Sequence, residues 1–140
     1  MKISAKGRYA LSMLLDLAEH QNDGFIALKD ISERRQISKK YLEQIIPVLN
    51  KANILKTTRG SHGGYMLAKN PENCTAGEIL RLTENTLFNH IDDTASSDER
   101  IDMRYVPLCD GLDRVVSEYL DRITLRDILD WNIGVFDYVI

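Results

Sequence analysis

Cysteine is scarce in this sequence, and long apolar runs are missing. Cys74 and Cys109 are its two cysteines. No stretch approaches the roughly 20 apolar residues that are needed to span a bilayer. Charged residues also interrupt the N-terminal segment where a signal peptide would need an apolar region. We therefore predict a cytoplasmic protein with reduced thiols and no membrane contact.

The signatures of an enzyme are missing too. The sequence has no paired carboxylates in a glycine-framed site, no nucleophile motif and no phosphate-binding loop. It does have 140 residues, of which 44% are hydrophobic, so it can bury the core of one domain. We predict a non-enzymatic protein.

Charge is divided unevenly along the chain. Residues 1–69 contain 12 lysines and arginines against 6 aspartates and glutamates, a net charge of +6. Residues 70–140 contain 6 against 15, a net charge of −9. A positive first half is the electrostatic footprint of a nucleic-acid binder, so we expect DNA to lie against this half.

Two short helical patterns with a tight turn between them lie inside the basic half. The first is LKDISERR, with Leu28 and Ile31 facing inward and the charged residues 33–35 facing solvent. Gln36 and Ile37 form the turn. Ser38 stands where the N-cap of a second helix belongs. The apolar stripe of that second helix is Leu42, Ile45, Ile46 and Leu49.

The opposite face of the second helix carries side chains that suit a major groove. Lysine bonds guanine or phosphate, glutamine pairs with adenine, and glutamate accepts from cytosine. The alternative is that this face is an ordinary solvated charged surface. The position of the second helix, directly after a helix and a turn, favours DNA contact instead. The predicted contacts in this segment are Ser38, Lys39, Lys40, Tyr41, Glu43 and Gln44.

A glycine-rich hairpin follows. After Asn53 the apolar period changes to two, and the cluster from Gly60 to Gly64 interrupts it. Glycine permits positive φ and lets backbone approach another surface, as a wing over DNA requires. We predict that Arg59 enters a minor groove at the wing tip, beside Gly60 and His62.

The chain start predicts another basic contact. Ser4 can cap a helix with apolar pairs at helical spacing, and Lys2, Lys6 and Arg8 cluster at its beginning. These side chains can bind phosphate together with the N-terminal backbone amides. A merely solvated basic end is the alternative.

The acidic half predicts a long loop and further helices. Thr75 to Glu78 has the form of a capping box, and residues 85–100 are polar and acidic. Pro107 begins a helix whose apolar residues recur alternately four and three apart, the rhythm of a dimer seam, unless this face packs only on its own domain. The seam residues are Ile101, Tyr105, Leu108, Leu112, Val115 and Tyr119. Thr124 can cap a last short helix.

Three segments carry a resemblance to a known family: MKISAKGRYAL at the start, DISERRQIS followed by KKYLEQII, and the run Arg59-Gly60-x-x-Gly63-Gly64-Tyr65. From Met1 to about Trp131 the chain resembles the IscR/CymR/NsrR (Rrf-two) family of bacterial winged-helix repressors. The resemblance implies a dimeric winged helix-turn-helix that regulates transcription without catalysis. In the iron–sulphur members three cysteines between 85 and 100 bind the cluster; here that region has none, so we predict no metal and no cofactor.

The predicted fold is therefore mainly α: a winged helix-turn-helix with a small β-hairpin wing and a long C-terminal dimerisation helix. Its parts are a DNA-binding domain at 1–84, an acidic loop at 85–100, dimerisation and terminal helices at 101–131, and an apolar tail at 132–140. The predicted function is repression from a palindromic operator by a homodimer. Two alternatives are a redox-sensing regulator using Cys109 and a protein-interaction adaptor that has lost DNA contact.

Within the family, the sequence looks nearest the cysteine-metabolism branch, which lacks a cluster and receives its signal through cysteine synthase. The resemblance includes an aromatic-rich tail that ends in isoleucine. We therefore expect Tyr138, Val139 and Ile140 to bind cysteine synthase, with the terminal carboxylate held by backbone amides over an apolar pocket. A tail that packs on its own dimer or is disordered is the alternative.

Overall fold

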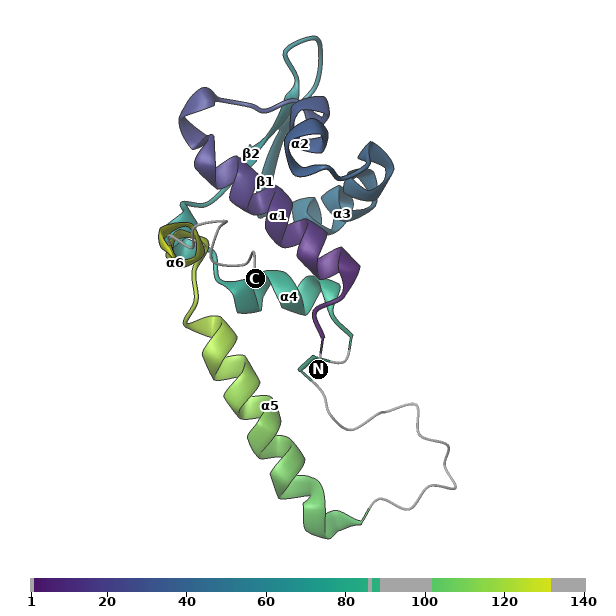
Figure 1. Ribbon diagram of the computed structural model, residues 1–140, viewed down its shortest axis with the longest axis vertical. Helices are drawn as coiled ribbons and strands as arrows, with labels where there is room; N and C mark the ends of the chain where they lie inside the picture. The colour runs from purple at the N-terminus through teal and green to yellow at the C-terminus, as the bar shows by residue number, and fades with distance from the viewer. Residues whose placement is uncertain (1, 86, 89–101, 132–140) are drawn as a thin grey trace, which may run out of the picture.

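The computed structural model describes residues 2–85, 87–88 and 102–131, and Figure 1 shows them as a winged helix-turn-helix body from which one long helix extends. The predicted fold class, mainly α with one hairpin, is confirmed. The longer helices are α1 (Ala5–Glu19), α2 (Leu28–Arg35), α3 (Lys39–Lys51), α4 (Ala76–Thr83), α5 (Val106–Asp121) and α6 (Leu125–Asp130). The strands are β1 (Leu55–Thr58) and β2 (Gly64–Leu67), and short 3₁₀ helices cover Gln21–Asp23, Pro71–Asn73 and Met103–Tyr105.

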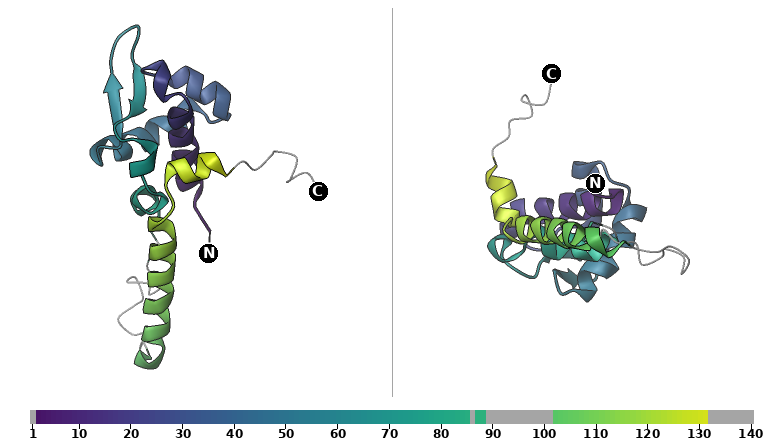
Figure 2. Two further views of the ribbon diagram at one scale, coloured as in Figure 1. Left: turned by 90° about the vertical axis from the view of Figure 1, so that its left-hand side faces the viewer. Right: turned by 90° about the horizontal axis from the view of Figure 1, so that it is seen from below.

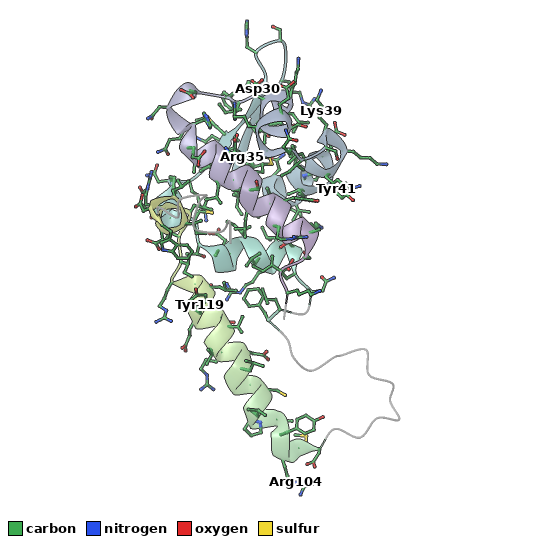
Figure 3. All side chains as sticks on the ribbon, viewed as in Figure 1. Asp30, Arg35, Lys39, Tyr41, Arg104 and Tyr119 are labelled. Carbon is green, nitrogen blue, oxygen red and sulfur yellow. The ribbon has the colours of Figure 1, made fainter. Side chains whose placement is uncertain are left out.

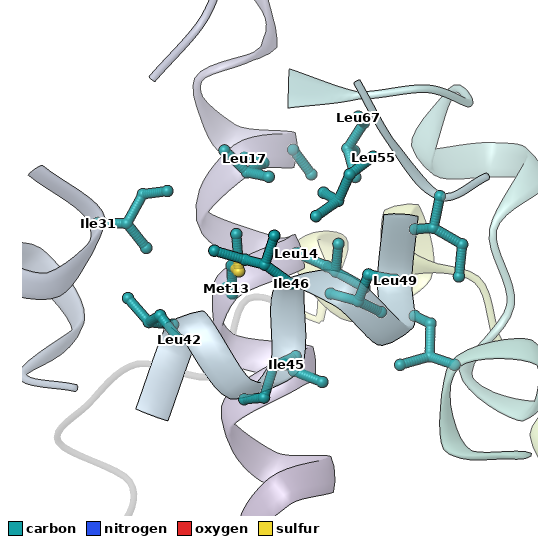
Figure 4. Close-up of a cluster of buried hydrophobic side chains, with 14 of the residues drawn as sticks. Met13, Leu14, Leu17, Ile31, Leu42, Ile45, Ile46, Leu49, Leu55 and Leu67 are labelled. Carbon is teal, nitrogen blue, oxygen red and sulfur yellow. The ribbon is translucent and has the colours of Figure 1, made fainter. Parts of the chain in front are cut away.

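The main core forms where α1 meets α2, α3 and the hairpin (Figure 4). Met13, Leu14 and Leu17 of α1 are almost fully buried against the apolar stripe of α3. Burial of each such side chain contributes about 1.5–3 kcal/mol. The stripe predicted to face inward is confirmed, since Leu42, Ile45, Ile46 and Leu49 are all buried.

Predicted caps begin four of the helices. The Ser4 hydroxyl accepts from the Gly7 amide at 3.0 Å, and the Ser38 hydroxyl accepts from the Tyr41 amide at 3.2 Å. Thr124 and Asp127 form a full capping box on α6. At α4 only half of the predicted box is present: Thr75 caps the Glu78 amide, but the Glu78 carboxylate pairs with Lys69 instead.

A buried carboxylate holds α2 against α1. The Asp16 side chain is 0% exposed and accepts from Arg34 Nε at 3.0 Å, Arg34 Nη2 at 2.8 Å and Arg35 Nε at 2.8 Å. The prediction that this end of α2 faces solvent is confirmed for Arg34, which is exposed, whereas Arg35 is half-buried, and the guanidinium groups of both bond to Asp16. Burial alone would raise the pKa of Asp16, but the hydrogen bonds and charges of Arg34 and Arg35 outweigh it and hold that pKa below its ordinary value.

The wing is anchored by a third extended segment that the sequence patterns did not predict. Ile26 pairs antiparallel with Tyr65 of β2, through two backbone hydrogen bonds of 2.8 Å. A Cβ at Gly64 would lie 2.3 Å from the Ile26 carbonyl oxygen, so this position requires glycine. The chain between α1 and α2 thus forms an isolated antiparallel bridge to the edge of the two-stranded sheet.

Helix α5 leaves the body and shares little of its core (Figures 1 and 2). Val116 is its one buried residue among those described, and it packs with Leu80 and Leu87 in a second, smaller cluster. Leu87 and Phe88, which were expected in the acidic loop, therefore pack against α4 and α5. The rest of that loop and the tail at 132–140 lie outside the described residues.

The junction between α5 and α6 is fastened to the start of α4. The Ala76 amide donates to the Ile123 carbonyl at 2.7 Å, and the Leu125 amide donates to the Cys74 carbonyl at 2.9 Å. Arg81 forms a bidentate ion pair with Asp121, with bonds of 2.5 and 2.8 Å. The base of α5 is thus held by backbone and side-chain bonds together. Across the described parts of the chain, none of the helices has the length and apolar character to cross a membrane.

Candidate nucleic-acid interface

The turn between α2 and α3 sets the direction of the second helix. Gln36 has a left-handed conformation with φ of 57°, which ends α2. Ile37 is buried and its carbonyl accepts from the Ser32 hydroxyl at 2.6 Å. Ser38 then caps α3, and the first turn of α3 presents Lys39, Lys40 and Tyr41 to solvent.

The side chains predicted to read DNA occupy this exposed start of α3. All six predicted residues from Ser38 to Gln44 are exposed, whereas Leu42 between them is fully buried. Two of them also have a structural role: Ser38 is the cap, and the Tyr41 ring, 52% exposed, lies 5.3 Å from the Tyr9 ring. Their contact with bases or phosphates stays a prediction.

The basic start of α1 lies beside the start of α3, as the Tyr9–Tyr41 contact shows. Lys2, Lys6 and Arg8 are all exposed there. Their backbone is tied to the end of α4, because Ser4 donates to the Glu84 carboxylate from both its amide and its hydroxyl, each at 2.5 Å. A Cβ at Gly7 would meet a Glu84 oxygen at 2.9 Å, so a glycine lets this carboxylate approach the helix start.

The wing loop presents its predicted contacts to solvent. Arg59, Gly60 and His62 are exposed, and Gly60 adopts φ of 107°, a conformation that favours glycine. A Cβ at Gly63 would lie 2.6 Å from the Thr58 carbonyl oxygen, so the loop is tight. The sequence patterns did not single out Lys56, an exposed side chain on β1, although its charge beside Arg59 was a usable signal.

These surfaces come from three separate segments and lie along one side of the body. In Figure 1 the wing loop is at the top, α3 is on the right, and the start of α1 lies below α3. Figure 3 shows Lys39 and Tyr41 on that side, away from α5. A capped helix after a helix and turn, with a basic wing on one flank, defines a DNA-binding winged helix-turn-helix regulator of transcription.

The chain belongs to the Rrf2 family, whose model, described as an iron-dependent transcriptional regulator, matches residues 3–131. It is 34% identical over 136 residues to the HTH-type transcriptional regulator CymR of Bacillus subtilis, covering 96% of this chain and 94% of that protein. The solved structure of that CymR, named as the global cysteine regulator, superimposes with a TM-score of 0.78 over 95% of this chain and 99% of that one. The structure of T. potens IscR, 34% identical, has a TM-score of 0.75 and covers 99% and 97%.

Membership confirms the predicted class and the prediction that the chain is not an enzyme, because the family and these relatives are transcriptional regulators. The predicted partner residues Tyr138, Val139 and Ile140 lie outside the described residues.

The donor atoms of this chain do not fit the iron centre that the family description suggests. Clusters are held mainly by thiolates, and the sequence has two cysteines. Cys74 is buried, and burial raises the pKa of its thiol to about 11, which disfavours a thiolate ligand. Among the described residues, Asp16, Glu19 and His20 converge closely enough to hold a cation, but the Asp16 carboxylate is already ion-paired with Arg34 and Arg35.

Proposed function

We propose that this chain is a cytoplasmic homodimeric repressor that binds a palindromic operator of cysteine and sulphur metabolism genes. The exposed start of α3, with the wing on one flank and the start of α1 on the other, is the observation that carries operator binding. Helix α3 would enter the major groove, Arg59 the adjacent minor groove, and the α1 lysines would contact phosphate.

The exposed apolar face of α5 supports the dimer. Leu108 is 74% exposed and Val115 is 64% exposed, and Tyr105, Leu112 and Tyr119 lie on the same seam. Solvent-exposed apolar rows of this size are typical of interaction surfaces. A second copy of α5 is self-complementary to this face, and the twofold axis it creates matches an operator with two half-sites.

Two observations support the cysteine branch. The alignment with B. subtilis CymR extends over nearly the whole of both chains, and the family's thiolate cluster does not fit this chain. In this proposal cysteine synthase is the partner that transmits the metabolic signal, and Tyr138, Val139 and Ile140 contact that enzyme.

A redox sensor is the second candidate function. Cys109 is half-buried in the first turns of α5, next to the seam residue Leu108, where oxidation would alter the dimer surface. A solved Staphylococcus aureus CymR, 32% identical to this chain, is named as an oxidised form. Mild peroxide followed by mass spectrometry and DNA binding separates the two functions, because a sensor must couple a modified Cys109 to lost operator affinity.

Footprinting on genomic fragments identifies the operator, and fluorescence anisotropy then measures affinity against salt. We expect a steep loss of affinity with salt, because each neutralised phosphate releases counterions. Gln44→Ala should cost about 1–3 kcal/mol on the operator and nothing on unrelated DNA, whereas Lys6→Ala should weaken both alike. Absence of salt-sensitive binding would favour the adaptor.

The dimer is tested by light scattering of the purified chain. The wild type should have twice the 16.0 kDa mass of one chain. Val115→Lys, on the seam, should shift the protein to monomer, whereas Asp110→Lys, on the exposed opposite side of α5, should leave the dimer intact. A monomeric wild type contradicts this part of the proposal.

Calorimetry tests the proposed partner. Cysteine synthase should bind the full chain and fail to bind a chain without Ile140, and O-acetylserine should compete. Equal binding by both versions, or binding by neither, removes cysteine synthase from the proposal.

A further inference from the structure

A pocket of about 340 Å³ lies behind the DNA-binding surface, between α1, the end of α2 and α6. Its volume is in the range of small-molecule sites. One wall is apolar and consists of Leu15 of α1, Ile128 and Leu129 of α6, and Trp131, which ends α6. Figure 2 shows α6 lying across α1, with which it is in contact.

Beside this apolar wall the pocket carries one charge of each sign. Glu19 and Arg35 line it, with Arg35 Nη2 3.2 Å from a Glu19 carboxylate oxygen, and Ser12 adds a hydroxyl. Arg35 also donates its Nε hydrogen to the buried Asp16. A guanidinium has five N–H donors, and these two bonds are the ones it makes among the described residues. Arg35 can therefore donate further hydrogen bonds to the carboxylate of a ligand while it keeps its bond to Asp16.

We propose that this pocket binds a small aliphatic α-amino acid. The carboxylate of the ligand bonds to Arg35, its ammonium group lies against Glu19, and its side chain packs on Leu15, Leu129 and Trp131. A zwitterion with an apolar branch matches a wall that offers one cation and one anion beside an apolar surface. A ligand that lacks one of its two charges makes one charged contact fewer with this pair.

The pocket is lined by both the helix-turn-helix and the C-terminal helix α6. Arg35 is the last residue of α2, and Asp16 fixes its position on α1. Helix α6 follows directly from α5, whose exposed face supports dimerisation. A ligand that binds one arrangement of α2 and α6 more tightly than another shifts the population of that arrangement. This regulatory step rests on the proposed function, whereas binding does not.

Trp131 reports binding directly, because it is the one tryptophan of the chain and it lines the pocket. The full-length protein is titrated with L-leucine and its fluorescence is recorded. We expect a saturable change. Isoamylamine, which lacks the carboxylate, and 4-methylpentanoate, which lacks the ammonium group, should each bind at least about tenfold more weakly, since each loses a charged contact.

A matched pair of variants locates the ligand. Glu19→Gln keeps a hydrogen-bond acceptor for Arg35 but removes the negative charge, so it should weaken L-leucine about tenfold and leave 4-methylpentanoate unchanged. Glu33→Gln, an exposed change on α2 outside the pocket, should alter neither. An unsaturable response to L-leucine, or equal affinities in all three proteins, overturns the site.

Operator affinity with and without L-leucine tests the regulatory step. A change of at least about threefold, lost in Glu19→Gln, supports coupling. Saturable fluorescence with unchanged operator affinity overturns the coupling. A protein that binds no DNA at all refutes the proposed function and leaves the site to be decided by fluorescence alone.

Discussion

The ion-pair cluster of Asp16, Arg34 and Arg35 predicts a large and unusual stability effect. Replacing both arginines with methionine leaves the Asp16 carboxylate fully buried without a partner. Removing the partner of a buried charge costs about 3–5 kcal/mol. For a chain of this length that is a fall in Tm of roughly 10–15 °C. Adding Asp16→Leu to the double variant should recover most of the loss, because no charge is then left in the core.

The pH dependence gives an independent check of the same cluster. In the wild type the folded-state pKa of Asp16 is depressed. The ionised carboxylate therefore contributes its full stabilisation of the folded state above the unfolded pKa of about 3.9. This stabilisation disappears as pH falls through the lower folded value. In the double variant burial acts alone and raises that pKa. Protonation then relieves the penalty, so the stability gap between the two proteins should narrow from pH 7 to pH 4.

Urea unfolding at equal protein concentration measures both effects, since the stability of the proposed dimer would depend on concentration. A double variant that loses less than about 1 kcal/mol would show that Asp16 reaches water when the arginines are absent. A further loss on adding Asp16→Leu, or a gap that widens toward pH 4, would also refute the reasoning.

Three further predictions concern separate parts of the molecule. Arg59→Ala should weaken operator binding by about 1–3 kcal/mol while its Tm stays unchanged, because the side chain is solvated without DNA; a large fall in Tm would make it structural. Glu84→Gln should lower stability by about 1 kcal/mol and weaken binding to every DNA sequence, because it loosens the start of α1. Ser4→Ala should reproduce both effects, measured by urea unfolding and by fluorescence anisotropy. Unchanged values would contradict the role of this contact. At pH 8 the Cys74 thiol, with a pKa of about 11, is about 0.1% thiolate. A thiol reagent should therefore modify Cys109 first, and Cys74 only when the protein unfolds. Equal rates of modification would show that Cys74 is accessible in the folded protein.

The parts of the fold that sequence patterns predicted are those that local residues decide. Ser38 caps the amide three residues later, and the apolar stripe of α3 lies within one helix. The exposed face of α3 follows from the same stripe. The helix-turn-helix and its candidate DNA-facing residues could therefore be predicted from the amino-acid sequence alone.

The features that sequence patterns missed all join residues far apart along the chain. Nothing in the residues around Arg34 points to Asp16, 18 residues earlier, and a charged helix end predicts solvent instead. The pairing of Ile26 with Tyr65 and the approach of Glu84 to Ser4 depend likewise on how the helices pack. Such contacts belong to the tertiary structure, and a periodicity of two or 3.6 residues carries no information about them.

The attachment of α5 at one end has a mechanical consequence. The helix has 16 residues, so it is a rod about 24 Å long at 1.5 Å per residue. With its base held by bonds from Ala76, Leu125 and Arg81, a tilt of about 5° at that base moves the far end by about 2 Å. In the proposed dimer, where two such helices would cross at a twofold axis, the same small rotation would change the distance between the two α3 helices by a comparable amount. A small change in the α5–α6 junction at residues 121–125 would thus decide whether the two α3 helices of the proposed dimer can enter successive major grooves at the same time.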